Sequence, residues 1–180
     1  IVPQAEQTFL NAFQEWKQKA SNAVIDYGFH MTITNPSQQR LKELDILDQL
    51  AVKSVKCFTA YPNKLMLSDK LLYRVLQKAK EKDFLLCFHC ENGEIIQERM
   101  NDYLSEGNIH PQYHALSRPS ILETESVSKI LDFARLVDVP VYIAHLSSYE
   151  ALERIKLLRK YNNSNVTLET CPQYLLLSDQ

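Results

Sequence analysis

The sequence predicts an α/β fold built on a parallel β-sheet with crossover helices. Two observations point to this fold: helical segments alternate with short apolar segments, and the apolar segments are nearly continuous. We expect strands of this kind to be buried on both faces, as in a parallel sheet covered by helices. The length of 180 residues, with 45% hydrophobic and 23% charged residues, suits one globular domain.

The first elements follow from periodicity and composition. Apolar residues at helical spacing predict an amphipathic helix over residues 6–20. The segment 24–34 is rich in β-branched and aromatic residues and ends at Asn35-Pro36, a turn signal, so we expect a strand there. Leucines at every third position predict a second helix over 41–50.

The middle of the chain continues the alternation of strand and helix. We expect a strand over 55–61, closed by Pro62. Ser68 is a suitable N-cap for a helix that carries regularly spaced apolar residues to about residue 79. The apolar segment 84–88 predicts a short buried strand.

A polar stretch over 91–119 interrupts this pattern, and its first part, 94–104, is expected to be helical. Periodicity then predicts a helix, a strand, a helix and a last strand, at 123–136, 139–144, 148–160 and 166–170. Two architectures fit the resulting order, a doubly wound sheet and a (β/α)8 barrel. Five strands suffice for the first and are too few to close the second, which typically takes about 250 residues.

Composition excludes several classes of function. The formal net charge is −2, so nothing indicates binding to nucleic acid or to an anionic membrane. No apolar run approaches the roughly 20 residues of a membrane helix. Gly28, Gly93 and Gly107 are too far apart for a phosphate-binding loop or a dinucleotide fingerprint.

The cysteines indicate a reducing environment. They lie within or beside apolar segments, at positions 57, 87, 90 and 171, rather than in the loops of a disulfide scaffold. The run at 87–90 resembles half of a zinc knuckle, but no second pair follows at finger spacing. We interpret the four residues as reduced thiols, small and buried, and since no signal peptide is visible we expect a cytoplasmic protein.

Two histidines follow neighbouring predicted strands. His89 comes directly after 84–88 and His145 directly after 139–144. Because the carboxyl ends of parallel strands meet at one edge, both imidazoles are expected there. One histidine in such a place is usually a hydrogen-bonded rim residue, whereas two at matching positions make a metal site an equal alternative. His30, His110 and His114 lie elsewhere and are less informative.

Lys56 is the unusual residue of the predicted strand over 55–61. A buried ammonium is costly without a partner. The side chain can point to solvent or lie along a helix, it can act as a base or Schiff-base lysine with a lowered pKa, or its neutral amine can react with carbon dioxide. The resulting carbamate has two oxygens and can bridge two metal ions. The pattern alone leaves all three interpretations open.

Five motifs in this order resemble the hydantoinase/dihydropyrimidinase group of the amidohydrolase superfamily. They are KCFTAY at 56–61, HCENG at 89–93, YHALSRP at 113–119, HLSS at 145–148 and ETCPQYL at 169–175. The resemblance extends over essentially the whole chain. It implies a (β/α)8 TIM barrel of amidohydrolase type, of which this chain resembles strands three to seven.

The resemblance also implies an activity and a site. Members open cyclic amide or ureide rings, such as hydantoins and 5,6-dihydropyrimidines, by hydrolysis. By position, Lys56 matches a carboxylated lysine that bridges two divalent ions, preferably zinc, and His89 and His145 match ligands of one ion. Tyr61 matches a tyrosine whose hydroxyl supports the oxyanion. Members are often tetramers, so a homo-oligomer is expected.

The chain departs from the family pattern at its two ends. It contains no His-x-His pair, which members carry on the first barrel strand, and no counterpart of the aspartate on the eighth strand. We therefore expect residues 1–180 to be a single partial barrel domain without the flanking strands and the β-sandwich. The chain would hold half of the expected protein ligands, and we expect it to be inactive alone.

Two further interpretations compete with a hydantoinase. The first is a non-catalytic relative that acts in protein interactions, but such relatives replace the bridging lysine and the histidines, which are present here at 56, 89 and 145. The second is an allantoinase or a dihydroorotase. The segment 169–174 resembles allantoinases, whereas Tyr61 and the segment 113–119 favour the hydantoinase side.

Overall fold

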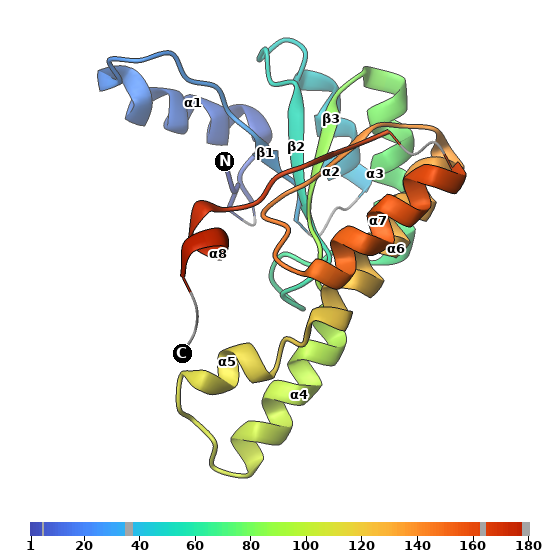
Figure 1. Cartoon of the computed structure of the whole chain (residues 1–180). Helices are drawn as coiled ribbons and strands as arrows, with labels where there is room; N and C mark the ends of the chain where they lie inside the picture. Colours follow the sequence, from blue (N-terminus) through green and yellow to red (C-terminus); the bar gives the residue numbers. More distant parts are fainter. Residues whose placement is uncertain (5, 35–37, 163–164, 178–180) are drawn as a thin grey trace.

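The computed structural model describes residues 1–4, 6–34, 38–162 and 165–177, and its centre is a five-stranded parallel sheet (Figure 1). The strands are β1 (Met31–Thr32), β2 (Ser54–Phe58), β3 (Leu85–His89), β4 (Val141–Ile143) and β5 (Val166–Leu168). Each strand pairs with the next strand along the chain. A doubly wound sheet reverses its order at a switch point, so this consecutive order identifies part of a (β/α)8 barrel.

Helices occupy the connections between the strands. They are α1 (Phe9–Lys19), α2 (Gln38–Glu43), α3 (Asp69–Lys82), α4 (Gly93–Ser105), α5 (Gln112–Leu116), α6 (Ser120–Val137), α7 (Tyr149–Asn162) and α8 (Pro172–Leu176). Short 3₁₀ turns follow α1 at Ala20–Asn22 and α2 at Leu44–Ile46. The pair α4 and α5 projects from the carboxyl ends of the strands (Figure 1). None of the described helices is both long and apolar enough to cross a membrane.

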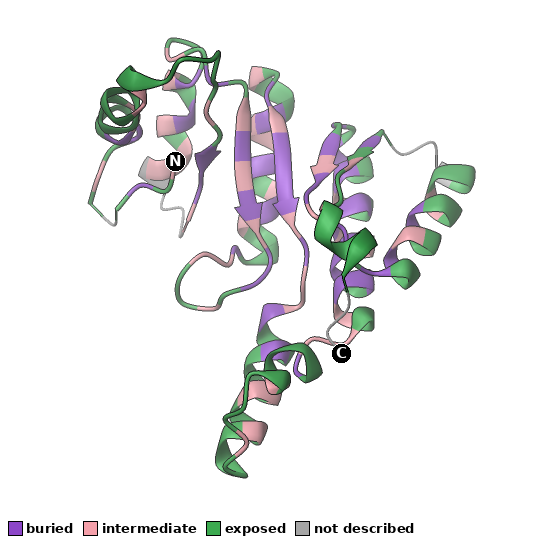
Figure 2. Cartoon of the chain, turned by 60° about the vertical axis from the view of Figure 1, so that its left-hand side comes forward, coloured by how far each residue is buried: buried purple, intermediate pink, exposed green. Residues whose placement is uncertain are grey.

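The core lies between one face of the sheet and the helices that cover it. In β2, Val55 and Cys57 are fully buried, and they belong to the same cluster as Leu72 of α3 and Ile130 of α6. Figure 2 shows buried residues along the strands and on the inward sides of these helices. Apolar burial of this kind stabilises the fold by about 25 cal/mol for each Å² removed from water.

The second face of the sheet is less buried than the sequence predicts. It carries a row of residues in register across all five strands: Thr32, Lys56, Cys87, Tyr142 and Thr167. Lys56 and Tyr142 are only half-buried and Thr167 is exposed. The expectation of two buried faces is therefore wrong here, because the described strands form an open sheet whose second face is incompletely covered.

The expected strand over 24–34 is also wrong for most of its length. Only Met31–Thr32 pairs with β2, while Val24 and Ile25 are 97% and 77% exposed. β-Branched composition favours a strand only where a neighbouring strand and a buried face are available. The predicted turn at Asn35-Pro36 lies outside the described residues.

The remaining elements differ from expectation mainly at their boundaries. The helix predicted over 41–50 is the shorter α2 followed by a 3₁₀ turn, and α5 and α8 were not predicted. The other helices and strands are confirmed to within a few residues. The four cysteines are unpaired, as expected; Cys57, Cys87 and Cys90 are buried, whereas the expectation of burial is wrong for Cys171, which is partly exposed.

A close backbone contact at Gly93 fixes the start of α4 against the end of β2. Gly93 N donates to Thr59 O at 3.2 Å, and a Cβ at Gly93 would meet Ala60 Cα at 2.6 Å. We expect Gly93→Ala to lower the free energy of unfolding by roughly 1–3 kcal/mol, because the backbone at Ala60 must shift to make room for the added methyl group. Urea denaturation of the complete protein measures this change. Gly28→Ala is the control, since nothing lies within 4 Å of its Cβ position, and equal effects of the two changes would contradict the contact.

Candidate metal centre

The structure brings the two predicted histidines together. His89 is the last residue of β3, and His145 lies two residues beyond β4, the neighbouring strand. His89 Nδ1 and His145 Nε2 are 3.1 Å apart, and the ring centroids are 4.8 Å apart. Two ring nitrogens from adjacent strands therefore face the same point at the carboxyl edge of the sheet.

Glu91 sets the orientation of His89. Its Oε2 is 2.8 Å from His89 Nε2, and Arg118 Nε lies 3.9 Å from its other oxygen. Burial raises the pKa of Glu91, but the hydrogen bond from His89 and the charge of Arg118 outweigh burial and lower it. An ionised carboxylate only accepts hydrogen bonds, so His89 donates from Nε2. In the neutral ring, Nδ1 then carries the lone pair and accepts a hydrogen bond from His145 Nε2 at 3.1 Å.

His145 is held in an unusual backbone conformation and kept neutral. Its φ is +41°, in the left-handed region that few non-glycine residues adopt. Burial, His89 and Lys56 all lower the pKa of His145 below its ordinary value. A neutral imidazole is the form that binds a metal ion.

Lys56 lies on the open face of the sheet, next to Cys87 in register. Its Nζ is 5.4 Å from the centre of the Phe58 ring. Because Val55 and Cys57 face the helices, Lys56 does not lie along a helix; a side chain that points to solvent, a base or Schiff-base lysine and a carbamate all stay open. Burial lowers the pKa of Lys56, which increases the fraction of neutral amine.

Tyr61 lies in a tight turn after β2 rather than at the end of the strand. Its φ is +65°, and its carbonyl accepts hydrogen bonds from Lys64, Leu65 and Met66. The Tyr61 ring is 5.2 Å from the His89 ring. Burial and the charge of Glu91 raise the pKa of Tyr61, so its hydroxyl keeps its proton and can donate a hydrogen bond.

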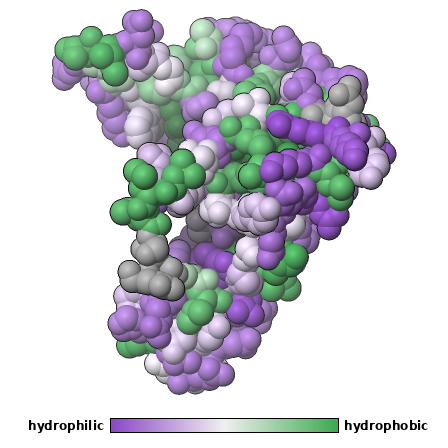
Figure 3. Space-filling view, in the orientation of Figure 1, coloured by the Kyte–Doolittle hydropathy of each residue, from purple (hydrophilic) through white to green (hydrophobic). Residues whose placement is uncertain are grey.

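The two histidines, Glu91 and Tyr61 line an open cavity of about 630 Å³. Its lining includes residues from four separate stretches of chain: Tyr61, His89, Glu91, Arg118, Glu123 and His145. Lys56 is not part of the lining, since it lies deeper on β2 than Phe58, which pairs with His89 at the edge. Figure 3 shows an apolar surface over α8, where Leu175 and Leu176 are exposed.

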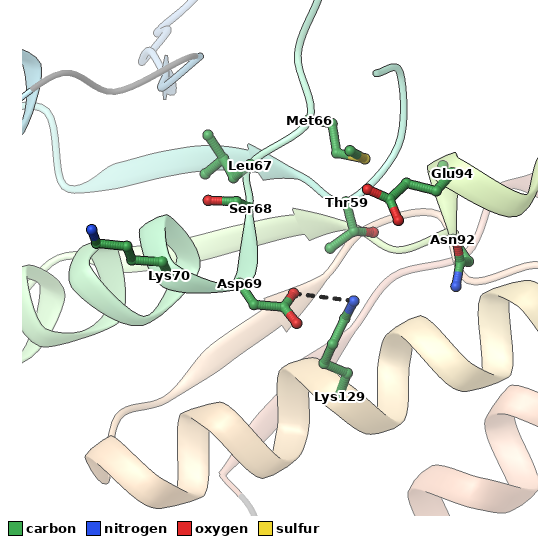
Figure 4. A pocket seen from close by; sticks show the side chains of 10 residues that line it. Thr59, Met66, Leu67, Ser68, Asp69, Lys70, Asn92, Glu94 and Lys129 are labelled. Atoms are coloured by element: carbon green, nitrogen blue, oxygen red, sulfur yellow. Dashed lines mark ion pairs between the residues drawn. The ribbon is translucent and has the colours of Figure 1, made fainter. Parts of the chain in front are cut away.

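A second cavity, of about 380 Å³, lies at the first turns of α3 and α4 (Figure 4). Lys129 of α6 points into it and pairs with Asp69 at 3.2 Å. Its lining contains no histidine or cysteine. Because its one inward lysine already has a partner, we assign no catalytic role to this cavity.

The sequence pattern gives no sign of a functional role for two residues of the larger cavity. Glu123 stands at the start of a predicted helix, and Arg118 is one residue of the 113–119 motif. Their partners are distant in sequence: Glu123 bonds to Ser147 and Ser148, and Arg118 approaches Glu91. Only the packing of the α5–α6 region against the strand ends brings these pairs together, so no local pattern signals them.

The sequence is similar to those of known hydantoinases and dihydropyrimidinases. No family model matches the chain. It is 39% identical to D-hydantoinase of Geobacillus stearothermophilus over 92% of its length and 36% identical to dihydropyrimidinase of Dictyostelium discoideum over 89%. These matches cover 36% and 32% of the relatives, so the chain spans about a third of the length of the curated relatives it matches.

Solved structures of the same group of proteins also match the fold of this chain. The crystal structure of dihydropyrimidinase from Brevibacillus agri matches with a TM-score of 0.93 and 36% identity, over 98% of this chain and 39% of that one. D-hydantoinase from Bacillus sp. AR9 matches with a TM-score of 0.94 and 36% identity, over 99% and 40%. By sequence and by fold, the chain therefore belongs to the hydantoinase/dihydropyrimidinase group, and it corresponds to a segment of its members.

Proposed function

We propose that the complete protein is a cyclic amidohydrolase that opens a hydantoin or 5,6-dihydropyrimidine ring with the help of divalent metal ions. One observation carries the proposal: His89 Nδ1 and His145 Nε2 are 3.1 Å apart at the carboxyl edge of the sheet, with the Tyr61 ring beside His89 and Lys56 two residues deeper on β2 than Phe58, the register partner of His89. The relatives named D-hydantoinase and dihydropyrimidinase supply the substrate class.

The residues present fit a metal centre of two ions, most simply zinc, bridged by a carboxylated lysine. Zinc binds neutral imidazole and oxygen anions, and burial keeps His145 neutral and favours the neutral amine of Lys56. That amine attacks the carbon of carbon dioxide and releases one proton, which gives a carbamate with two donor oxygens.

This donor set does not complete the site. Within the described ranges, no three His, Cys, Asp or Glu residues lie close enough to hold a metal. Zinc takes about four ligands per ion. We therefore propose that further ligands come from outside the described residues, that 1–180 is part of a single barrel domain, and that the 180-residue chain alone is inactive.

Each residue has a distinct part in the proposed reaction. Bound metal ions lower the pKa of water and polarise the amide carbonyl. Glu91 holds His89 in the tautomer whose Nδ1 is free to bind. Lys56, as the carbamate, would supply an anionic oxygen ligand to the metal centre. Tyr61 donates its hydroxyl proton in a hydrogen bond to the oxygen on which negative charge develops.

The ligand class and the oligomeric state rest on the family, whereas the net charge and the unpaired cysteines support the remaining statements on partners and location. The ligand is a small cyclic amide or ureide, with no nucleic acid or membrane involved. We propose a homo-oligomer, a tetramer as in many members, in the cytoplasm.

The test is metal content together with ring opening. The complete protein, purified with zinc and bicarbonate, is expected to hold about two zinc ions per chain and to open dihydrouracil or hydantoin. The loss of ultraviolet absorbance of the ring measures the reaction. The 180-residue chain is expected to hold almost none. Allantoin and dihydroorotate belong in the panel because the segment 169–174 resembles allantoinases. A protein with both ions that opens none of these rings would reject the substrate class, and one without metal would favour the non-catalytic relative.

A further inference from the structure

His145 requires support from outside its own strand. The left-handed conformation costs a non-glycine residue about 1–2 kcal/mol. Such a residue therefore stays in it only when the surrounding structure stabilises it. The φ of +41° turns the chain directly after β4. The direction of the imidazole therefore depends on what holds the residues next to it.

Glu123 holds the residues that follow His145. Its Oε1 accepts from Ser147 N at 3.0 Å, and its Oε2 accepts from Ser147 Oγ at 3.0 Å and from Ser148 N at 2.6 Å. Glu123 belongs to the first turn of α6 and is only 8% exposed. A buried carboxylate is costly unless its oxygens are satisfied, and here three bonds go to one short segment.

Residues after β5 hold the same turn from the other side. His145 N donates to Glu169 Oε2 at 3.2 Å, and Leu146 N donates to Glu169 O at 2.6 Å. Thr170 Oγ1 donates to Leu146 O at 2.8 Å. The residues after β5 therefore hold one side of the turn, and the Glu123 carboxylate holds the other side.

We propose that Glu123 is a positioning residue for the metal centre: its carboxylate fixes the Ser147–Ser148 backbone and thereby keeps His145 Nε2 directed at the point that His89 Nδ1 also faces. Glu123 does not bind the ion itself. The inference rests on the proposed function, since the point faced by the two nitrogens is the proposed metal position. It adds a residue from the helix before β4 to the requirements of that site.

The experiment compares Glu123→Gln with wild type in the complete protein, using zinc affinity by chelator competition and the visible spectrum of the cobalt-substituted form. The amide presents an NH₂ group to one backbone N–H, so that contact becomes repulsive. We expect one ion to bind at least about 10-fold more weakly and the cobalt spectrum to change, as for other groups that orient ligands.

Three variants separate positioning from general damage. Asp132→Asn, an exposed carboxylate on the same helix, is expected to leave affinity and spectrum unchanged. Ser147→Ala removes one of the three bonds to Glu123 and keeps both backbone bonds, so it should weaken the same ion less than Glu123→Gln does. Glu123→Asp keeps the charge but shortens the reach, so it should weaken the same ion, and it decides the question if Glu123→Gln does not fold.

The outcomes are distinguishable. A Glu123 variant with wild-type zinc affinity and cobalt spectrum overturns the positioning role and leaves the proposed function intact. A lower urea midpoint with an unchanged spectrum also overturns it, because the residue would then be structural only. Wild-type protein that binds no zinc overturns the proposed function and this inference with it.

Discussion

Lys56→Ala is expected to remove bound metal and ring-opening activity from the complete protein together. Lys56 would supply the only anion that both ions share, and without it two cations must be held close together with no charge between them. Loss of a group that merely orients a ligand typically costs about 10–100-fold in metal affinity, so loss of this direct ligand should cost more. Metal analysis after gel filtration and a dihydrouracil assay measure the two effects.

Lys53→Ala is the matched control. Lys53 precedes the same strand, is exposed and pairs with Asp48 at 2.6 Å, so its loss should change neither zinc content nor turnover. A short carboxylate such as formate or acetate is expected to restore part of the activity of Lys56→Ala, because it can occupy the space and charge of the carbamate. A Lys56→Ala protein that still carries two tightly bound ions would refute the bridging role.

Most of the fold could be predicted because each connection and strand carries its own local signal. Periodicity alone predicts α3, α6 and α7, and continuous apolar segments predict β2 and β3. The prediction of a strand over 24–34 is wrong for most of that segment, because its residues have no neighbouring strand except at Met31–Thr32. Strand order also could not be derived, since a doubly wound sheet and a barrel segment share the same local patterns.

The site could be predicted only in part, for a similar reason. His89 and His145 follow directly from topology, because consecutive parallel strands deliver their last residues to one edge. Glu91 belongs to the HCENG motif at 89–93, but its 2.8 Å bond to His89 depends on how the chain turns after β3. Glu123 is 22 or more residues from the turn it holds, so its role depends on how α6 packs beside β4.

Tyr61→Phe is expected to lower kcat by roughly 10²–10³-fold while zinc content stays at the wild-type value. The phenol is placed by a left-handed turn beside the His89 ring, and both burial and Glu91 raise its pKa. A raised pKa means that the hydroxyl remains a donor up to at least its ordinary pKa of about 10, so its ionisation should not limit activity between pH 7 and about 9. Phenylalanine keeps the ring contact and removes only the donor.

The comparison of kcat with metal content distinguishes this role from a structural one. Tyr161→Phe, at an exposed position near the end of α7, is the control and should match wild type. If Tyr61 served only to pack against His89, the phenylalanine variant would retain nearly full turnover, because the aromatic contact is preserved. A fall in zinc content would instead show that Tyr61 supports the metal site. Only a large loss of kcat with both ions retained assigns the hydroxyl to the developing oxyanion.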